Sequence, residues 1–240
     1  MKLLTTDFRA IRKLDDLGRW YVNCFVERAA SAIPPRSRVL DAGAGEAAYE
    51  SLFAHCRYVA CDLAVGDTTW NYRNLDTINR LEKLPFRDGA FDAVLCTQVL
   101  EHMEWPRECV AEFHRVLRPG GTFHVTVPMA QAEHQVPFDF FRYTSHGLRS
   151  ILAGAGFREM RIEPFGGLAT RLAYELPRLL ALFPPGGLRS GRPSLRGIAL
   201  IPLRILAALV IRLLQRTLLF TERYDHEKTD PFGWGVVATK

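Results

Sequence analysis

Cysteine is scarce in this 240-residue chain, and its five residues form no recognisable pattern. No Cys-x-x-Cys or Cys-x-His pair occurs, so a structural zinc site is not predicted and no metal ligands are expected. The odd, sparse set also argues against a disulfide scaffold and favours a reducing compartment. We therefore expect a cytoplasmic protein.

Long apolar runs are also missing. Residues 1–16 have no sustained apolar stretch and no small-residue cleavage site, so no secretory signal is expected. No window of about 18 uncharged apolar residues occurs, which excludes an ordinary membrane-spanning helix. The nearest approach is Gly197–Phe220, and arginines interrupt it.

Charge of one sign is not in large excess, with 31 Lys and Arg against 26 Asp and Glu. The net charge of +5 permits contact with anionic lipid or nucleic acid but requires neither. No patch of basic residues interleaved with aromatic ones is present, so nucleic acid is not an expected partner. With 48% hydrophobic residues the chain is not disordered, and its length fits one α/β domain with an insertion.

Over the first two-thirds of the chain, short apolar or β-branched runs alternate with helical stretches. This alternation is typical of a parallel sheet with helical crossovers. The expected strands are Arg38–Asp41, Tyr58–Asp62, Phe91–Cys96, Thr122–Val127 and Phe232–Ala238. The expected helices are Leu17–Ala32, a segment that follows the glycines and ends near Ala54, Pro106–Leu117 and Leu148–Ala155.

The composition changes after about residue 166, where Leu, Arg, Pro and Gly become frequent. We expect a single domain, 1–240, in which a hydrophobic, basic insertion precedes the last strand. Its parts are an N-terminal helical segment (1–37), a core (38–166 with 231–240) and the insertion (167–230).

The segment Val39–Gly45, with the sequence VLDAGAG, is the most informative in the chain. A buried strand ends in an acid, and two glycines then allow the backbone to approach a ligand. The spacing Gly43-x-Gly45-x-x-Ala48 also matches a dinucleotide fingerprint. A carboxylate at Asp41, however, would repel a pyrophosphate but can hold an ammonium group.

The second acid of this region ends the next predicted strand. Asp62 follows Gly45 by 17 residues, where its carboxylate can accept hydrogen bonds from ribose hydroxyls. Open α/β sheets bind ligands at such carboxyl ends of strands.

Five motifs in register resemble the class I S-adenosylmethionine-dependent methyltransferases, in particular the small-molecule subgroup of ubiquinone and menaquinone enzymes. They are Val39–Gly45, Asp62, Leu84–Asp92, Val99–His102 and Val116–Gly121. The resemblance spans about Val39–Phe157. It implies a Rossmann-like, doubly wound, mostly parallel seven-stranded sheet with an antiparallel last strand, and S-adenosylmethionine as the cofactor.

The resemblance also implies cofactor contacts along this edge of the sheet: Asp41, Gly43 and Gly45 at the methionine end, Asp62 at the ribose, Leu63, Leu81 and Glu82 near the adenine, and Thr97 and Gln98 near the sulfonium. One position departs from the pattern. Relatives often have an acid where this chain has Arg80, so Glu82 or a backbone group would take that contact, or the adenine end would be held more weakly.

The loop after the predicted strand Thr122–Val127 is expected to face the transferred methyl group. It gathers the candidate catalytic residues His134, Asp139, Arg142 and Tyr143 among three phenylalanines. A His beside a carboxylate can deprotonate an acceptor hydroxyl, and an Arg can hold an acidic substrate group. The alternative is that Asp139 and Arg142 pair to stiffen the loop. His102 is interpreted as a packing or capping residue rather than a base.

Within the insertion, a helix over Pro202–Arg223 would place its arginines in one narrow sector. The remaining faces are almost wholly apolar. This pattern favours a helix in an anionic membrane interface through 197–223, at the inner membrane face. A lid over the site and a homodimer contact are the alternatives.

These observations predict methyl transfer from S-adenosylmethionine to a small or lipid-linked acceptor, with oxygen as the favoured acceptor atom. Two alternatives stay open: a methyltransferase-like module that binds cofactor or membrane without turnover, and an NAD(P)-dependent oxidoreductase.

Overall fold

The structure is a computed structural model that describes residues 16–66, 69–182 and 199–240. The described part forms two compact units, one with Arg19–Phe165 and Gly233–Lys240, the other with Gly166–Phe232. The expectation of a single domain with an insertion stays a prediction. The expected lack of a signal within residues 1–15 and the Pro/Gly break at 183–193 lie outside the described residues.

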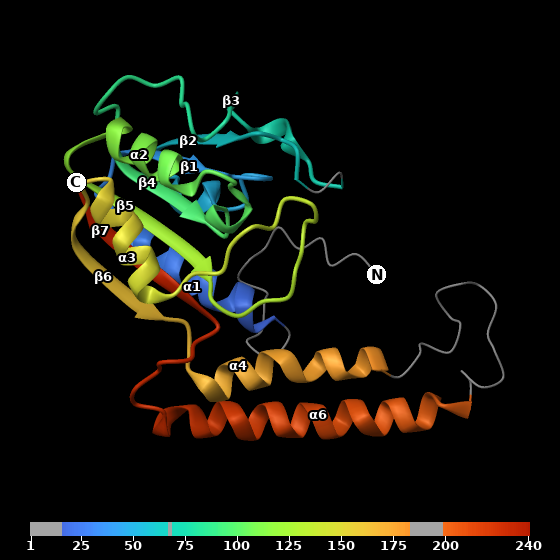
Figure 1. Cartoon of the computed structure of the whole chain (residues 1–240). Helices are drawn as coiled ribbons and strands as arrows, with labels where there is room; N and C mark the ends of the chain where they lie inside the picture. The colour runs from blue at the N-terminus through green and yellow to red at the C-terminus, as the bar shows by residue number, and fades with distance from the viewer. Residues whose placement is uncertain (1–15, 67–68, 183–198) are drawn as a thin grey trace. The chain divides into compact units, whose positions relative to one another are not determined.

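A seven-stranded sheet with the order β3-β2-β1-β4-β5-β7-β6 is the centre of the first unit (Figure 1). Its strands are β1 (Arg38–Ala42), β2 (Arg57–Asp62), β3 (Thr77–Ile78), β4 (Phe91–Thr97), β5 (Leu117–Pro128), β6 (Arg158–Pro164) and β7 (Gly233–Thr239). β1 pairs in parallel with β2 and β4, whereas β7 runs antiparallel to both β5 and β6. The predicted fold class is confirmed.

The central strands are buried on both faces, as the apolar runs in the sequence require. In β1, Val39 and Leu40 have no exposed surface, and in β4 the same holds for Val94 and Cys96. Both strands carry candidate site residues near their carboxyl ends: Asp41 on β1 and Thr97 on β4. Because β1 lies beside β4, the strand order changes direction between them, and open α/β sheets bind ligands at such a point.

The helices of the sheet unit follow the sequence pattern closely. They are α1 (Leu17–Ala32), α2 (Pro106–Val116) and α3 (Ser145–Gly154). α1 has the predicted bounds, and α2 starts with Pro106, whose ring suits a first helical turn. α3 begins three residues before the predicted Leu148, because the Thr144 side chain caps it by accepting a hydrogen bond from the Gly147 N–H.

The helix predicted to follow the glycines is wrong. Residues 43–54 form turns and a single 3-10 turn, Glu50–Phe53. Gly45 and Ala47 both have left-handed backbone, with φ of +55° and +56°, so a right-handed helix cannot run through this segment.

Two strands of the sheet, β3 and β6, are not among the strands expected from the sequence. β3 has only two residues. β6 reads REMRIEP, and its charged residues leave no apolar run to identify it.

The second unit contains α4 (Leu168–Glu175), a 3-10 segment Leu176–Leu182 and α6 (Ile201–Thr221). α4 and α6 lie side by side (Figure 1), and polar groups join them. The Gln215 Nε2 donates to the Ala173 carbonyl oxygen at 2.8 Å, and the Thr170 hydroxyl donates to the Glu222 carboxylate at 2.8 Å. Within the described residues, no helix has the length and apolarity that crossing a bilayer requires.

Candidate functional site

Asp41 occupies the carboxyl end of β1 and is 1% exposed. Its Oδ2 accepts a hydrogen bond from the Tyr58 hydroxyl, whereas Oδ1 has no partner among the described residues. Burial, only partly opposed by the Tyr58 hydrogen bond, raises the pKa of the carboxyl to about 7. A buried carboxylate oxygen without a partner is costly, and an ammonium group of a ligand would satisfy it.

The glycine turn brings backbone close to this carboxylate. The N–H groups of Gly43 and Ala44 both donate to the Cys61 carbonyl oxygen, at 2.8 and 3.1 Å. Gly43 has φ of +84°, and a Cβ at this position would lie 2.4 Å from a Val99 methyl carbon. The turn therefore requires glycine for conformation and for space.

Gly43→Ala is expected to destabilise the fold by about 1–3 kcal/mol, because it adds both left-handed strain and overlap with Val99. Chemical denaturation measures the loss. Val99→Ala in the same chain removes the two methyl carbons that overlap most but neither the Val99 Cβ, 3.0 Å away, nor the strain, so the double variant should recover part of the stability. A Gly43→Ala protein as stable as wild type would contradict this account of the turn.

Asp62 stands at the end of β2 and orients the same turn. Its Oδ2 accepts from the Gly45 N–H at 2.9 Å, and its Oδ1 accepts from the Ala64 N–H at 2.8 Å. A carboxylate has about four lone-pair sites, so two remain for a ligand. Leu63, the predicted adenine contact, follows it and is 37% exposed.

Trp70 is a further neighbour of the turn, and no sequence motif predicts it at the site. A Cβ on Gly45 would lie 3.1 Å from Trp70 Cζ3, so the indole lies directly against the glycine. The only signal in the sequence is a large aromatic residue within a polar, turn-rich segment. This contact makes the indole a natural reporter of occupancy.

The other predicted cofactor residues lie in two segments, one around Leu81 and Glu82 and one at the end of β4. Leu81 is 3% exposed and belongs to the core, and Glu82 pairs with Arg80 at 3.1 Å. Thr97 ends β4, and the Gln98 N–H donates to the Thr126 carbonyl oxygen at 3.0 Å. The carboxyl ends of β1, β2 and β4 thus meet at one edge with Asp41, Asp62 and the Thr97–Gln98 pair.

The loop after β5 is held by an ion pair between two predicted catalytic residues. Arg142 donates to both carboxylate oxygens of Asp139, at 2.7 and 2.8 Å. Its remaining donors go to the carbonyl oxygens of Gln131, Ala132 and Phe141. With every guanidinium N–H engaged, Arg142 has none left for a substrate anion.

The Arg142 guanidinium also holds the pKa of the Asp139 carboxyl well below its usual range, which makes Asp139 a poor base. Tyr143 is buried, with its hydroxyl donating to the Leu100 carbonyl oxygen at 2.8 Å. For these three residues the contacts favour the structural alternative. His134 differs, because its Nδ1 lies 3.1 Å from the Ala132 carbonyl oxygen while its Nε2 has no hydrogen bond within the described residues.

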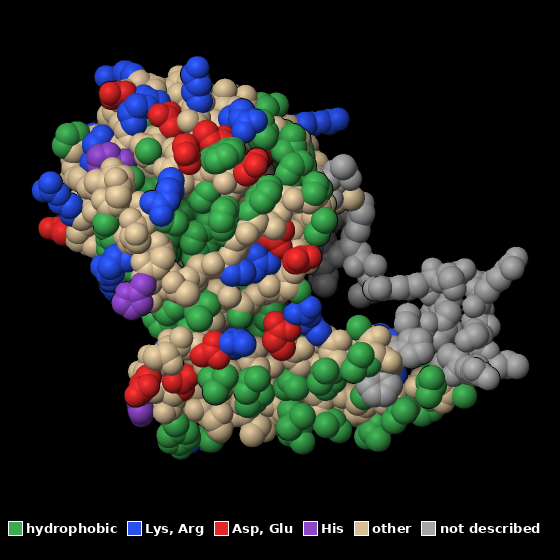
Figure 2. All heavy atoms as spheres, viewed as in Figure 1, with side chains coloured by type: hydrophobic (Ala, Val, Ile, Leu, Met, Phe, Trp, Pro, Cys, Tyr) green, Lys and Arg blue, Asp and Glu red, His purple; other side chains and the backbone are tan. Residues whose placement is uncertain are grey.

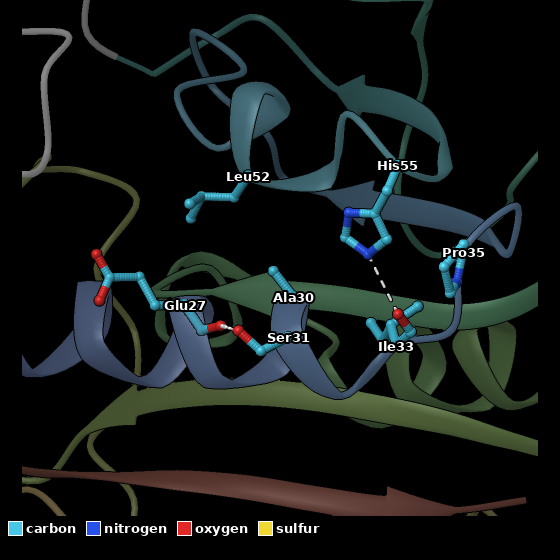
Figure 3. Close-up of a pocket in the computed structure, with 7 residues that line it drawn as sticks. All are labelled: Glu27, Ala30, Ser31, Ile33, Pro35, Leu52 and His55. Atoms are coloured by element: carbon cyan, nitrogen blue, oxygen red, sulfur yellow. Dashed lines mark hydrogen bonds between the residues drawn. The ribbon is translucent and has the colours of Figure 1, made fainter.

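A separate shallow depression of about 500 Å³ lies between α1 and the Glu50–Phe53 turn. Figure 3 shows His55 directed at the Ile33 carbonyl oxygen, with Leu52 and Pro35 nearby. These residues directly precede β1 or β2, or lie on the neighbouring turn, so the depression is at the amino ends of the strands. Ligands of open α/β sheets bind at the opposite edge, and the depression is not the candidate site.

Known proteins resemble this chain over the region that contains β1, β2 and β4. Residues 40–125 match the model of a methyltransferase domain. A protein of Mycolicibacterium smegmatis described as "Probable S-adenosylmethionine-dependent methyltransferase" is 36% identical over 156 residues, which are 62% of this chain and 56% of the relative. Demethylmenaquinone methyltransferase of Renibacterium salmoninarum is 32% identical over 133 residues, 52% of this chain and 54% of the relative.

The chain thus spans about half the length of these two curated relatives. Among solved structures, a SAM-dependent methyltransferase from Archaeoglobus fulgidus shares the fold with a TM-score of 0.57, at 17% identity, over 97% of this chain and 96% of that one. The motif order, the sheet order and the matched domain agree: residues 40–125 match a methyltransferase domain, and the chain shares the fold of a solved SAM-dependent methyltransferase.

Proposed function

We propose that this protein transfers a methyl group from S-adenosylmethionine to an oxygen atom of a small or lipid-linked acceptor. The observation that carries the proposal is the unpartnered Oδ1 of Asp41, buried beside the glycine turn at the carboxyl end of β1. The α-ammonium of the cofactor has the charge and the donors that this oxygen lacks.

The other proposed cofactor contacts follow the edge of the sheet. Asp62, already oriented by two backbone N–H groups, would accept from the ribose hydroxyls. Leu63 would pack on the adenine, with Leu81 and Glu82 at its far end. Thr97 and Gln98, at the end of β4, would lie near the sulfonium.

Methyl transfer requires little further chemistry from the protein. The sulfonium is an activated donor, so catalysis consists mainly of in-line positioning and, for an oxygen acceptor, removal of a proton. Of the predicted catalytic residues, His134 keeps a ring nitrogen without a hydrogen bond to the described residues. His134 is therefore the proposed group for the proton, with Asp139 and Arg142 as its support.

Calorimetric titration with S-adenosylmethionine, S-adenosylhomocysteine and NAD tests the cofactor. Micromolar binding of the first two without binding of NAD is expected, with a change in Trp70 fluorescence because that indole lies against Gly45. Binding of NAD alone would replace the proposal by the oxidoreductase alternative. Cofactor binding without turnover on any phenolic, carboxylic or lipid-linked acceptor would favour the non-catalytic module.

For the second unit, we propose that α6 lies on an anionic membrane surface at the inner membrane face. Its apolar side chains are turned outward, and Figure 2 shows hydrophobic residues along this element. The outward residues, each 45–65% exposed, are Leu203, Ile205, Leu206, Leu209, Val210, Leu213, Leu214 and Phe220. The inward face instead buries Ile211 and Gln215. An exposed apolar face with flanking arginines suits a helix in a lipid interface.

Replacing Arg204, Arg212 and Arg216 together by alanine is expected to weaken binding to anionic vesicles by about 100-fold, since each basic residue near such a surface contributes about 1 kcal/mol. Flotation with phosphatidylcholine vesicles, with and without phosphatidylserine, measures the effect. The control replaces three exposed arginines of the sheet unit: Arg57, Arg107 and Arg149. A wild-type chain that stays at the bottom of the gradient would reject the membrane proposal, and a dimer in solution would support the dimer alternative.

A further inference from the structure

Three side chains of metal-ligand type converge beside the candidate site. Glu101 and His102 belong to the 3-10 turn Leu100–His102 that follows β4, and His134 belongs to the loop after β5. One ligand atom from each lies within 4.8 Å of the others. The rings of His102 and His134 meet edge to face, with centroids 4.7 Å apart.

Hydrogen bonds fix how the two imidazoles present their nitrogens. The Nδ1 of His102 lies 2.6 Å from the Phe138 carbonyl oxygen, and the Nδ1 of His134 lies 3.1 Å from the Ala132 carbonyl oxygen. A carbonyl oxygen only accepts, so Nδ1 is the donor in both rings and Nε2 is the nitrogen that can bind a metal ion. An imidazole whose Nδ1–H donates to a carbonyl or a carboxylate is the common form of a metal-ligating histidine.

Glu101 gives the second, independent observation. Its side chain has no exposed surface, and neither carboxylate oxygen has a hydrogen-bond partner among the described residues. The Nε2 of His102 is also buried and unpartnered in that part of the chain. Buried polar atoms are normally satisfied, so three such atoms in one cluster require a common explanation. A cation bound between them satisfies all three.

Hydrogen bonds fix the backbone that carries these three side chains. The N–H groups of Phe140 and Phe141 both donate to the Glu101 carbonyl oxygen, at 2.8 and 3.2 Å. The Asp139 carboxylate accepts from the His134 N–H at 2.9 Å and lies 3.4 Å from its Nδ1. Asp139, fixed in turn by Arg142, is thus a positioning residue for His134.

We propose that Glu101, His102 and His134 bind a divalent transition-metal ion through one carboxylate and two Nε2 atoms. Two imidazoles and a carboxylate suit Zn²⁺ or Fe²⁺, whereas Mg²⁺ and Ca²⁺ prefer all-oxygen sites. Three protein ligands leave a coordination position for water or for an acceptor oxygen. With the ion bound, the Nε2 of His134 is a ligand, so the role of His134 as the proton acceptor belongs to the metal-free protein. Ligand atoms around a tetrahedral zinc lie about 3.4 Å apart, so the separations between these ligand atoms, now within 4.8 Å, would shorten by up to about 1.4 Å on binding.

The test uses the full chain, free of any affinity tag and stripped with a chelator, and Co²⁺ as a coloured substitute for Zn²⁺. Wild type is expected to take up one Co²⁺ per chain with visible d–d absorption, which Zn²⁺ then displaces and Mg²⁺ does not. His134→Ala and Glu101→Gln should each weaken Co²⁺ binding by at least about 100-fold, since the first removes one of three ligands and the second replaces a charged carboxylate by a neutral amide. The matched control, His146→Ala, removes an exposed histidine of α3 and should bind like wild type.

Two further measurements keep the outcome decisive. Zn²⁺ should raise the Tm of wild type and of His146→Ala but not of Glu101→Gln, which keeps the shape of the buried side chain. Asp139→Asn should weaken binding by about 10–100-fold, as expected of a positioning residue. Absence of stoichiometric Co²⁺ uptake by wild type, or wild-type affinity in His134→Ala, would overturn the proposal. S-adenosylhomocysteine binding, measured in the same samples, reports on the methyltransferase proposal separately.

Discussion

Asp41→Asn is expected to lower the affinity for S-adenosylhomocysteine by at least about 100-fold, which corresponds to about 2.7 kcal/mol. The substitution keeps the size of the side chain and an oxygen that can accept from Tyr58. It removes the negative charge that would face the cofactor ammonium in a buried site, where a charged hydrogen bond contributes most. Calorimetric titration gives the affinity directly.

The matched control is Asp88→Asn, which neutralises a carboxylate whose side chain is 82% exposed and pairs with Arg115. It should leave cofactor affinity unchanged. Near-normal affinity in Asp41→Asn, with the control unaffected, would remove Asp41 from the site and the assignment that depends on it.

The same residue predicts a pH dependence. Because burial raises the pKa of Asp41 to about 7, the free protein holds this carboxyl protonated below that pH. A proton must then leave before an ammonium binds, so affinity should fall up to tenfold for each pH unit below 7 and level off above it. The effect on folding has the opposite sign. Because the pKa of this carboxyl is higher in the folded chain than in the unfolded chain, the free energy of unfolding falls as pH rises from 3.8 to about 7. Asp41→Asn should remove the contribution of this carboxyl to both slopes, whereas the contribution of Glu101, whose pKa burial raises to about 8, remains in the stability profile.

Phe123→Ala is expected to lower the free energy of unfolding by about 3–5 kcal/mol, the largest loss predicted for a single residue of the sheet unit. Phe123 has no exposed surface and stacks on Phe157 with centroids 5.2 Å apart, while Phe113 lies 5.4 Å away. Truncation leaves a cavity between the ring of Phe113, on α2, and that of Phe157, which directly precedes β6. Urea denaturation measures the change.

Phe138→Ala is the control, because that ring is 47% exposed and its removal should cost less than about 1 kcal/mol. Phe123→Leu should fall between the two, since most of the volume is kept. If Phe123→Ala and Phe138→Ala lost the same stability, the three-ring cluster would not be the centre of the core.

The sheet was largely predictable because its central strands are short apolar runs between turn residues. α1 and the ends of β1, β2 and β4 follow from apolar periodicity and from Pro and Gly positions. The prediction of a helix after Gly45 was wrong because Ala47 adopts φ of +56°, which nothing in the local sequence indicates. β6 was not predicted because pairing with β7 at the edge of the sheet, rather than its own composition, makes it a strand.

The candidate site was predictable only where a residue lies at the end of a strand. Asp62 is the last residue of β2 and Asp41 is the last but one of β1, and both lie next to the glycine turn. The cluster of Glu101, His102 and His134 forms by contact between two loops, and no sequence spacing encodes that contact. The engagement of every Arg142 donor is likewise a property of the folded loop.

The position of β7 has a consequence for how the protein is made. β7 lies between β5 and β6 in the sheet, yet it begins at Gly233, whereas β6 ends at Pro164. On the ribosome, β5 and β6 therefore emerge with the intervening position empty, and the whole second unit is synthesised before the strand that joins them. Until then two hydrogen-bonding strand edges stand open, which is when a nascent chain is most prone to aggregate and most dependent on chaperones.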